Sequence, residues 1–597
     1  MPVYSAPLEN IRFVMHEILD AQKLSELPGY EEVSEDLIDQ ILEEAAKICQ
    51  EVLFPLNQSG DKEGCIFENG VVRTPIGFKE AYKTFSEGGW CGLSGDPAYG
   101  GMGMPMLLNV AVQEMICSAN MSFGMYPGLS EGAYNALHLH GTDEQKQTYL
   151  PKLTTGEWSG TMCLTEPHCG TDLGLIKTKA VPNKDGSYCI TGTKIFISAG
   201  EHDLTDNIIH LVLAKLPDAP DGVKGISLFV VPKFLPKDDG SSGARNGVAC
   251  GAIEHKMGIK ASATCVINLD DATGWLVGEP HKGMRAMFTM MNTARLGVGM
   301  QGLGIAEVAY QNALTYARER LQMRALDGAK APEKPADPII VHPDVRRMLL
   351  TAKAFTEGSR ALSYWIGMTQ DYAEKHPDPK VREEADDLVA LLTPVIKAYQ
   401  TDMGFDVANI AMQVYGGHGY IWDHGVEQYA RDARIAMIYE GTNGIQALDL
   451  VGRKMGAHYG RYLRRFFHPV GEFIEQNQSD PKMQEFIFPL AKAFAKLQQA
   501  TATVAQKGLK NPNEAGAASS DYLRMFALVA LGYMWGLIAK KSLKGLESGS
   551  EDRKAFYESK IATARFFFER MLPEADSRFK SLTSGAANLM ELDAANF

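Results

Sequence analysis

The chain has 597 residues, of which 45% are hydrophobic, and a formal net charge of −14. This length allows about four domains of ordinary size, and the apolar share supports substantial cores. The acidic excess argues against nucleic acid as the main partner, because phosphate binding depends on clustered lysine and arginine. The nine cysteines include no CxxC pair, so we expect free thiols in a reducing compartment.

The first residues, Met1 to Pro7, contain no basic cluster and no continuous apolar stretch. A secretory signal needs both features, and a transit peptide is rich in arginine. We therefore expect neither kind of leader and, by default, a cytoplasmic location.

Residues 1 to 160 are predicted to form an N-terminal helical domain. Ile11, Val14 and Ile18 recur at helical spacing. Thr142, followed three residues later by Gln145, is typical of a capping box and predicts the start of a helix.

The spacing of the apolar residues then changes, and residues 161 to 280 are predicted to form a small β domain. Short β-rich runs occur at Ile208 to Leu213, Ile226 to Val231 and Thr264 to Leu269. Clusters rich in Pro, Gly and Asp separate them, as at Lys237 to Gly243.

Helix-forming stretches return from 281 to 455, which we predict to be a helical bundle, and continue from 456 to 597 as a helical extension. A polar break at Lys510 to Gly516 divides the extension. Its longest apolar run, Met525 to Ala539, would reach about 22 Å as a helix, against roughly 30 Å for a bilayer core. We predict a buried helix rather than a transmembrane segment, so any membrane contact would be peripheral.

Glu440 stands at the end of the apolar run Ile435 to Tyr439 and directly before Gly441. Desolvation raises the pKa of a glutamate toward neutrality, and a glycine allows close approach. Both features suit a base that removes a proton from carbon. The other interpretation is a buried ion pair with Arg431 or Arg434.

Two glycine motifs indicate other functions. Gly297 to Gly302 satisfies GxGxxG, a dinucleotide fingerprint, but Met284 to Arg295 before it favours a helix rather than a strand. We expect these glycines to allow close helix packing. Gly128 to Gly132 fits GxSxG and would make Ser130 the nucleophile of an acyl hydrolase, yet no apolar strand leads into it.

No metal site is predicted. His418 and His424 are separated by five residues and have no accompanying ligand set. Cys163 and Cys169 also lack the histidines that a metal site would need.

Several stretches between about residues 80 and 455 follow the order and spacing of one known family. They are Met162 to Gly174, Ile190 to Gly200, Glu254 to Lys260, Asn292 to Gly297, Tyr316 to Arg320, Gln413 to Tyr420 and Ile435 to Gln446. Together they resemble the acyl-CoA dehydrogenase family. Residues 456 to 597 resemble the C-terminal extension of its large members, which include long-chain acyl-CoA dehydrogenases and the subgroup acting on 3-methylmercaptopropionyl-CoA.

The resemblance implies a mainly α fold with an inserted, barrel-like β domain, followed by the helical bundle and the helical extension. It also implies FAD-dependent oxidation of an acyl-CoA thioester to trans-2-enoyl-CoA. The glutamate of this pattern, here Glu440, takes the α-proton, and the β-hydrogen leaves as hydride to the flavin. Some members carry the base just before the arginine of the block at 292 to 297. That position is Ala294 here, and no carboxylate lies between Glu279 and Glu307.

The resemblance further implies contacts to cofactor and substrate. Those to FAD are Thr165, Gly170, Thr171, Phe196, Ser198, Arg320, Gln413, Gly416, Gly417 and Thr442, and those to substrate are Asn292, Arg295 and Gly441. Arg320 matches an arginine that reaches the FAD of a neighbouring subunit, which implies a cofactor site shared between subunits. In large members the extension replaces contacts that smaller members make as tetramers, so we expect a homodimer. The other interpretation of Phe196 is core packing. Met162 and Gly444 depart from the aromatic residue and the glutamine that are frequent at their positions.

We expect electrons to pass to electron-transfer flavoprotein and the substrate to be a medium- or long-chain acyl-CoA of fatty acid β-oxidation. The alternatives are a 3-methylmercaptopropionyl-CoA dehydrogenase or an acyl-CoA oxidase. From other classes, an acyl hydrolase using Ser130 and a non-catalytic CoA-binding scaffold stay open. Stoichiometric FAD would separate the dehydrogenase from those two.

Overall fold

The computed structural model describes residues 2–549 and 551–597. The chain forms two compact units. The sheet unit comprises Ala45–Met104 and Met115–Gly297, and the helical unit comprises Met1–Glu44, Pro105–Glu114 and Val298–Phe597. The boundary between the units falls within two long helices, α5 (Met106–His140) and α7 (Gly283–Glu319).

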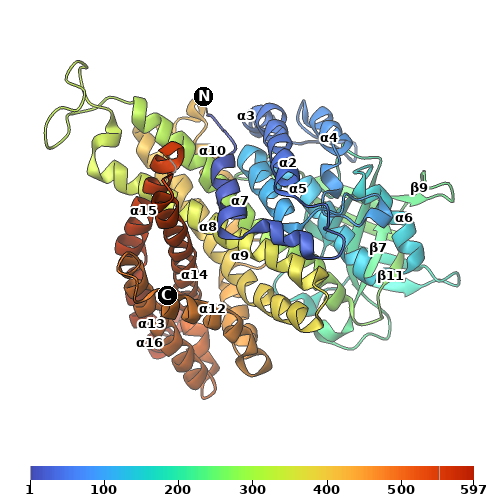
Figure 1. Ribbon diagram of the computed structural model, residues 1–597. Helices are drawn as coiled ribbons and strands as arrows, with labels where there is room; N and C mark the ends of the chain where they lie inside the picture. Colours follow the sequence, from blue (N-terminus) through green and yellow to red (C-terminus); the bar gives the residue numbers. More distant parts are fainter. Residues whose placement is uncertain (1, 550) are drawn as a thin grey trace. The chain divides into compact units, whose positions relative to one another are not determined.

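The sheet unit is built on seven strands, which lie in the predicted β region except that the first begins three residues before it (Figure 1). They are β3 (Trp158–Cys163), β4 (Lys179–Pro182), β5 (Tyr188–Ser198), β6 (Asn207–Lys215), β7 (Ile226–Pro232), β10 (Val248–Ile253) and β11 (Thr264–Val277). Five of them pair in a closed circuit, β11–β5–β4–β6–β7 and back to β11, while β3 and β10 extend it. The expectation of a barrel-like sheet is therefore confirmed.

Strands β6 and β7 read as nearly continuous apolar runs because they are buried along almost their whole length. One core, around Trp158 and Leu211, includes residues of α5 and of α6 (Asp143–Thr154). A second core, around Phe229 and Ile267, joins the strands of the circuit. The predicted capping box at the start of α6 is present, with Thr142 and Gln145 exchanging hydrogen bonds.

The expectation that residues 1 to 160 are helical does not hold throughout, because β3 begins at Trp158 and a hairpin lies further upstream. Between α3 (Pro55–Glu63) and α4 (Phe78–Glu87), strands β1 (Ile66–Glu68) and β2 (Val71–Arg73) form an antiparallel hairpin. Asn69 and Gly70 make its turn, both with positive φ. An Asn-Gly pair is a strong two-residue hairpin signal, and it decided the local structure against the helical surroundings. The cluster at Lys237 to Gly243 likewise turns between two short strands, β8 (Phe234–Pro236) and β9 (Ser242–Arg245).

The helical unit contains the predicted bundle and the predicted extension. Its bundle helices are the second part of α7 together with α8 (Pro343–Lys375), α9 (Pro379–Tyr415), α10 (Glu427–Ala433) and α11 (Asn443–Asp449). The extension comprises α12 (Arg461–Asn477), α13 (Gln484–Gly508), α14 (Pro512–Glu547), α15 (Lys554–Phe566), α16 (Glu574–Thr583) and α17 (Ala587–Met590). Figure 1 shows α13 to α16 side by side in brown and red, and they pack on one another. Helices α1 (Leu8–Arg12) and α2 (Glu35–Lys47) complete the N-terminal part.

The GxGxxG motif lies inside α7, so the dinucleotide interpretation is wrong and the packing interpretation is confirmed. A β-carbon on Gly302 would lie 2.3 Å from the main-chain oxygen of Gln400 on α9. One on Gly299 would lie 2.7 Å from Ile396 of the same helix. These two glycines therefore let α7 and α9 approach closely.

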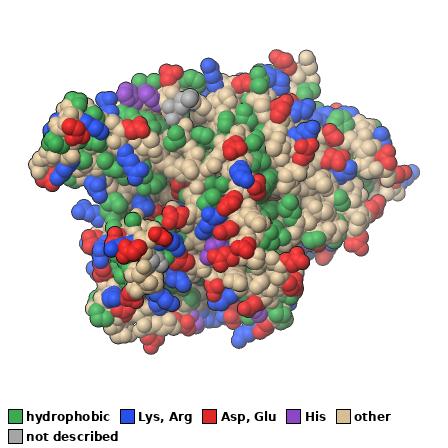
Figure 2. Space-filling view, turned by 45° about the horizontal axis from the view of Figure 1, so that its top comes forward, with side chains coloured by type: hydrophobic (Ala, Val, Ile, Leu, Met, Phe, Trp, Pro, Cys, Tyr) green, Lys and Arg blue, Asp and Glu red, His purple; other side chains and the backbone are tan. Residues whose placement is uncertain are grey.

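The apolar run Met525 to Ala539 lies within α14 and is buried. Among the described residues, α14 is the single helix long and apolar enough to cross a membrane, but 83% of its most apolar stretch is buried inside the protein. It packs on α8, α9, α11, α13, α15 and α16. The predicted buried helix is confirmed. On the face shown in Figure 2, acidic and basic side chains are interspersed rather than gathered by sign.

Candidate functional site

Glu440 lies on the short loop between α10 and α11, in the helical unit. The loop turns sharply, because Glu440 and Gly441 both have left-handed backbone, with φ of 58° and 83°. A non-glycine residue in this region is uncommon and marks strain that the surroundings must hold. The apolar run before it provides Ala436, which is fully buried, and the Glu440 side chain itself is half-buried.

Two neighbouring side chains, Gln446 and Gln301, hold the loop on either side of Glu440. Gln446 donates its side-chain amide to the Glu440 carbonyl at 2.9 Å. The Tyr439 hydroxyl donates to the side chain of Gln301 on α7. Gly441 has no room for a β-carbon, which would lie 2.7 Å from Nε2 of Gln446. The glycine noted in the sequence is therefore required by the close approach of Gln446 as well as by its backbone angles.

Lys397 on α9 also holds this loop, and sequence reasoning gave it no role. It is fully buried, and its Nζ donates to the Gly441 carbonyl and to Oδ1 of Asn443, each at 2.8 Å. The predicted FAD contact Thr442 is exposed and caps α11, where its hydroxyl oxygen accepts from the Ile445 amide at 3.4 Å. Arg431, considered above as a partner for Glu440, forms an ion pair with Glu427.

In the sheet unit, the two predicted flavin-binding stretches are joined by a buried ion pair. Lys194 on β5 donates to Oε1 of Glu166 at 2.9 Å and to the Leu164 carbonyl at 3.0 Å, and both charged side chains are buried. The Ile195 amide donates to the Thr165 carbonyl at 2.9 Å. The loop that carries Thr165 therefore lies against the strand that carries Phe196 and Ser198.

The same loop brings three predicted flavin contacts together. A β-carbon on Gly170 would lie 3.3 Å from Cγ2 of Thr165, so these two residues lie next to each other. Thr171 follows on the exposed side of the loop. Hydroxyls and loop amides at this place can hydrogen-bond the edge of a flavin.

Phe196 is 59% exposed, so the interpretation of core packing is wrong. Its backbone is left-handed, with φ of 59°, and this turns the ring out of the regular alternation of β5. Ser198, two residues on, is half-buried and pairs with Thr264 of β11. An uncovered aromatic ring beside hydroxyl groups fits the planar ring system of the FAD that the resemblance implies.

The remaining predicted FAD contacts gather at one end of the helical unit. Arg320 follows the end of α7, and Gln413 lies in the last turn of α9. Tyr316 joins these two helix ends, because its ring stacks on Tyr415 at 4.1 Å between centroids and its hydroxyl is hydrogen-bonded to Nδ1 of His418 at 2.8 Å. The predicted contacts at this end are all exposed, namely Arg320, Gln413, Gly416 and Gly417.

The two predicted substrate contacts on α7 differ in exposure. Asn292 is exposed, whereas Arg295 is only 7% exposed. The guanidinium of Arg295 lies 5.9 Å from the ring centroid of Phe288. Arg295 is thus not an ordinary solvated arginine on a helix surface.

Ser130 does not lie on a nucleophile elbow. It lies within α5 and is buried, and its hydroxyl donates to the Tyr126 carbonyl at 3.1 Å and accepts from the Gly160 amide at 3.0 Å. These bonds serve helix and sheet packing. The hydrolase alternative therefore has no activated serine at this position.

Among the described residues, a single set has three potential metal ligands close together, Glu166, His168 and Cys169. Glu166 already accepts from Lys194 and from the Thr178 hydroxyl, at 2.9 and 2.6 Å. The rings of His418 and His424 lie 4.6 Å apart, but neither belongs to such a set.

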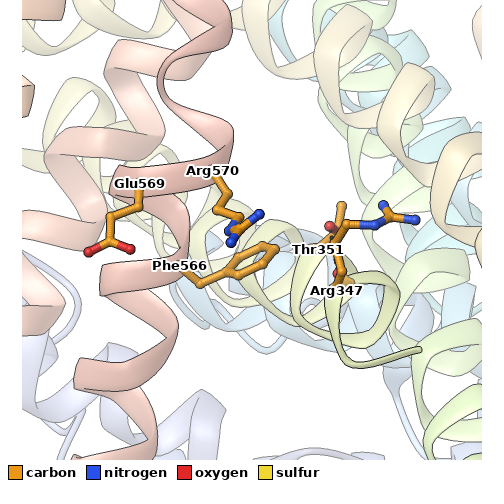
Figure 3. Close-up of a pocket in the computed structure, with 5 residues that line it drawn as sticks. All are labelled: Arg347, Thr351, Phe566, Glu569 and Arg570. Carbon is orange, nitrogen blue, oxygen red and sulfur yellow. Dashed lines mark hydrogen bonds between the residues drawn. The ribbon is translucent and has the colours of Figure 1, made fainter. Parts of the chain in front are cut away.

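A pocket of about 490 Å³ lies in the helical unit away from these residues (Figure 3). Its walls come from the start of α8 and the end of α15 with the turn after it, and they are formed by Arg347, Thr351, Phe566, Glu569 and Arg570. In Figure 3, Phe566 and Arg570 point toward Thr351, while Glu569 points away. None of the predicted site residues lines this pocket.

Four family models match the chain in order. They are the acyl-CoA dehydrogenase N-terminal domain over residues 36–157, the middle domain over 161–272, the C-terminal domain over 281–455, and the acetyl-CoA dehydrogenase C-terminal like domain over 466–593. The chain belongs to the acyl-CoA dehydrogenase family. The resemblance and the fold expected from the sequence are thereby confirmed, including the extension of the large members.

Similar proteins are matched over their whole length. A 3-methylmercaptopropionyl-CoA dehydrogenase of Ruegeria pomeroyi is 44% identical, covering 98% of this chain and 99% of that protein. The broad-specificity linear acyl-CoA dehydrogenase FadE5 of Mycobacterium tuberculosis is 35% identical over 100% of both chains. The structure of an acyl-CoA dehydrogenase complexed with FAD from Bacillus anthracis has a TM-score of 0.72 at 21% identity, covering 95% of this chain and 91% of that one. This acyl-CoA dehydrogenase is an FAD-binding oxidoreductase, as expected from the sequence.

Proposed function

We propose that Glu440 is the catalytic base of this acyl-CoA dehydrogenase and that the substrate is a short, unbranched acyl-CoA thioester. The observation that carries the assignment of the base is the Glu440 loop. One carboxylate follows an apolar run, its backbone is strained, and neighbouring side chains hold the carbonyl groups of Glu440 and Gly441. Strained, over-determined backbone of this kind clusters at active sites.

The chemistry requires two things of the protein. The α-proton of a thioester is weakly acidic, so a base must take it while hydrogen bonds hold the developing negative charge on the carbonyl oxygen. We assign the first task to the Glu440 carboxylate and the second to its main-chain N–H. FAD, when bound, supplies the acceptor for the β-hydrogen.

The residues proposed to hold FAD form two groups. In the sheet unit, Thr165, Gly170 and Thr171 lie on the loop against β5, and Phe196 and Ser198 lie on that strand. In the helical unit, Arg320, Gln413, Gly416 and Gly417 gather at the helix ends joined by Tyr316, and Thr442 caps α11. Exposure of the second group supports a homodimer in which Arg320 reaches the cofactor of a partner subunit.

Similarity to known enzymes supports a short substrate. The relative from Ruegeria pomeroyi acts on 3-methylmercaptopropionyl-CoA, and a butyryl-CoA dehydrogenase of Syntrophomonas wolfei is 36% identical over 97% of both chains. A 3-methylmercaptopropionyl group has the length of a pentanoyl group, with sulfur in place of one methylene. We therefore propose 3-methylmercaptopropionyl-CoA as the first substrate to test, rather than the medium- or long-chain esters of β-oxidation, and electron-transfer flavoprotein as the acceptor.

Anaerobic titration of the purified, FAD-loaded protein tests this proposal. Butyryl-, pentanoyl-, 3-methylmercaptopropionyl-, octanoyl- and palmitoyl-CoA are added separately while the oxidised-flavin absorbance is followed. We expect fastest bleaching with the 3-methylmercaptopropionyl ester. Faster bleaching by octanoyl- or palmitoyl-CoA would overturn the short-chain proposal, and bleaching that survives in Glu440→Gln would overturn the assignment of the base.

A further inference from the structure

We propose that Lys397 is a positioning residue for the catalytic base, holding the Glu440 loop in the conformation that removes the α-proton. This inference rests on the proposed function of Glu440. It concerns a lysine on α9 that is far from the loop in sequence and fully buried beneath it.

The contacts of Lys397 are directed at the loop. Its ammonium donates to the carbonyl of Gly441, the residue after Glu440, and to Oδ1 of Asn443, both at 2.8 Å. The first contact anchors the main chain next to the base. The second anchors the start of α11, and so the point at which the loop ends.

Asn443 extends this anchor to more of α9. Its side-chain amide donates to Oδ1 of Asp402 at 2.6 Å and to the carbonyl of Ala398 at 3.1 Å. Lys397, Ala398 and Asp402 thus fasten α11 and the loop to neighbouring turns of one helix. From the other side, Gln446 donates to the Glu440 carbonyl at 2.9 Å.

The strained backbone explains why such an anchor is needed. A glutamate with φ of 58° tends to relax toward ordinary backbone angles, and relaxation would move its carboxylate. The Lys397 bond to the Gly441 carbonyl opposes that relaxation at the adjacent peptide group. Rates of proton transfer fall steeply when reacting groups shift by about 1 Å, so a small movement has a large effect.

The buried charge indicates more than packing. An ammonium group is costly to bury unless it is fully hydrogen-bonded, and a neutral donor would be cheaper for structure alone. The geometry therefore assigns to Lys397 the position of the loop.

The test compares Lys397→Met with wild type, with Glu440→Gln and with Lys560→Met. Lys560 is a second buried lysine of the helical unit, and it is bonded to Glu357 at 3.0 Å and to Asn10, neither of which belongs to the loop. Its substitution therefore controls for loss of any buried lysine. Each protein is examined for FAD content, binding of an acyl-CoA with sulfur at the β-position, removal of the α-proton from that ester, and flavin reduction by substrate. The sulfur analogue can lose its α-proton but cannot give a hydride, so its spectral change on binding reports the base alone.

For Lys397→Met we expect normal FAD content and ester binding, with α-proton removal and flavin reduction slowed by about a hundredfold. Lys560→Met should keep wild-type rates. Wild-type rates in Lys397→Met, with Glu440→Gln inactive, would overturn the positioning role alone. Activity retained in Glu440→Gln would overturn the proposed function. If Lys397→Met is recovered without FAD, Lys397→Gln, which keeps one donor for Gly441, is measured in the same way. A wild-type rate in it would support the positioning role, and loss of FAD from this variant too would overturn it in favour of a purely structural one.

Discussion

Trp535 donates its indole N–H to the main-chain carbonyl of Ala354 at 3.0 Å. This bond joins α14 of the extension to α8 of the bundle, and the indole is fully buried. Gly358, one turn further along α8, makes room for it, because a β-carbon there would lie 2.6 Å from the indole nitrogen. Packing of α14 against α8 thus requires a residue without a β-carbon at position 358.

Gly358→Ala should destabilise the protein by about 1–3 kcal/mol, since extra volume in a packed core forces side chains from their preferred positions. Thermal unfolding of the FAD-loaded protein measures the effect. Gly516→Ala on α14 is the matched control, because nothing lies within 4 Å of the added methyl group. It should leave stability unchanged or raise it by about 0.5–1 kcal/mol. Equal melting temperatures for the two variants would contradict the packing argument.

Glu440→Gln should retain FAD and CoA-ester binding while losing turnover by at least about 10²–10⁴-fold, the usual contribution of a positioned base. The amide has nearly the shape of the carboxylate but accepts no proton. Stopped-flow flavin reduction gives the rate, and equilibrium titration gives ester affinity. A variant with unchanged turnover would show that the base lies elsewhere.

Phe196→Ala should weaken FAD binding about two- to thirteenfold, which corresponds to the roughly 0.5–1.5 kcal/mol of an aromatic stacking contact. Fluorescence titration of the apoprotein with FAD measures the affinity. Phe488 on α13 is 56% exposed, close to the 59% of Phe196, and serves as a control for removal of an exposed ring. Phe488→Ala should bind FAD as wild type does. Unchanged affinity in Phe196→Ala would argue against contact with the cofactor.

Arg360→Met should cost about 3–5 kcal/mol of stability, because it leaves buried carboxylates without a counter-charge. The Arg360 guanidinium contacts Glu114 and Glu307, each at 2.6 Å, and all three side chains are buried. Arg347→Met is the surface control, since that arginine is half exposed and pairs with Asp344. A loss in Arg360→Met no larger than in the control would contradict this account. Chemical denaturation monitored by far-UV circular dichroism provides the comparison.

Asp371 should make stability depend on pH near neutrality. Burial raises the pKa of this carboxyl from 3.8 to about 7, against the hydrogen bonds that it accepts from the amides of Met106 and Leu107 and from the Tyr30 hydroxyl. The folded protein therefore binds this proton more tightly than the unfolded chain does between pH 4 and 7. The stability that it contributes is full below about pH 4 and is lost as the pH rises through 7.

Comparison with Asp371→Asn isolates that contribution from other titrations. The melting temperature of wild type minus that of the variant should fall between pH 5 and pH 8. A difference that is constant or rises with pH would show that the carboxyl is already ionised in the folded protein at pH 5.

Local sequence signals were enough for much of the fold and for selecting Glu440 as a candidate base. The apolar run and the glycine that mark the Glu440 loop are adjacent in sequence, and the strands near Ile208 and Ile226 are long enough to be read by composition. Lys397 could not be found this way. It lies on a helix whose sequence has no feature that points to the Glu440 loop. Only the tertiary fold brings the Lys397 ammonium within hydrogen-bond distance of the Gly441 carbonyl.

The hairpin at Asn69 and Gly70 was misread, and the core-packing alternative for Phe196 failed, for different reasons. The Asn69-Gly70 hairpin carried a recognised turn signal that the helical surroundings concealed. Phe196 carried no signal that would turn it outward, since an aromatic residue in an apolar strand is usually buried. Its exposure follows from a left-handed backbone angle that composition does not report.

Helix α14 also has a consequence for synthesis of the protein. During translation an apolar segment of its length and hydropathy leaves the ribosome as a nascent chain, where insertion into a lipid bilayer competes with folding. Helices α8 and α9, which cover part of α14, precede it in the chain and can fold first. Because of this order, α8 and α9 are already available to pack on α14 when it leaves the ribosome. A rearranged gene that encodes α14 ahead of α8 should therefore yield more membrane-associated or aggregated product.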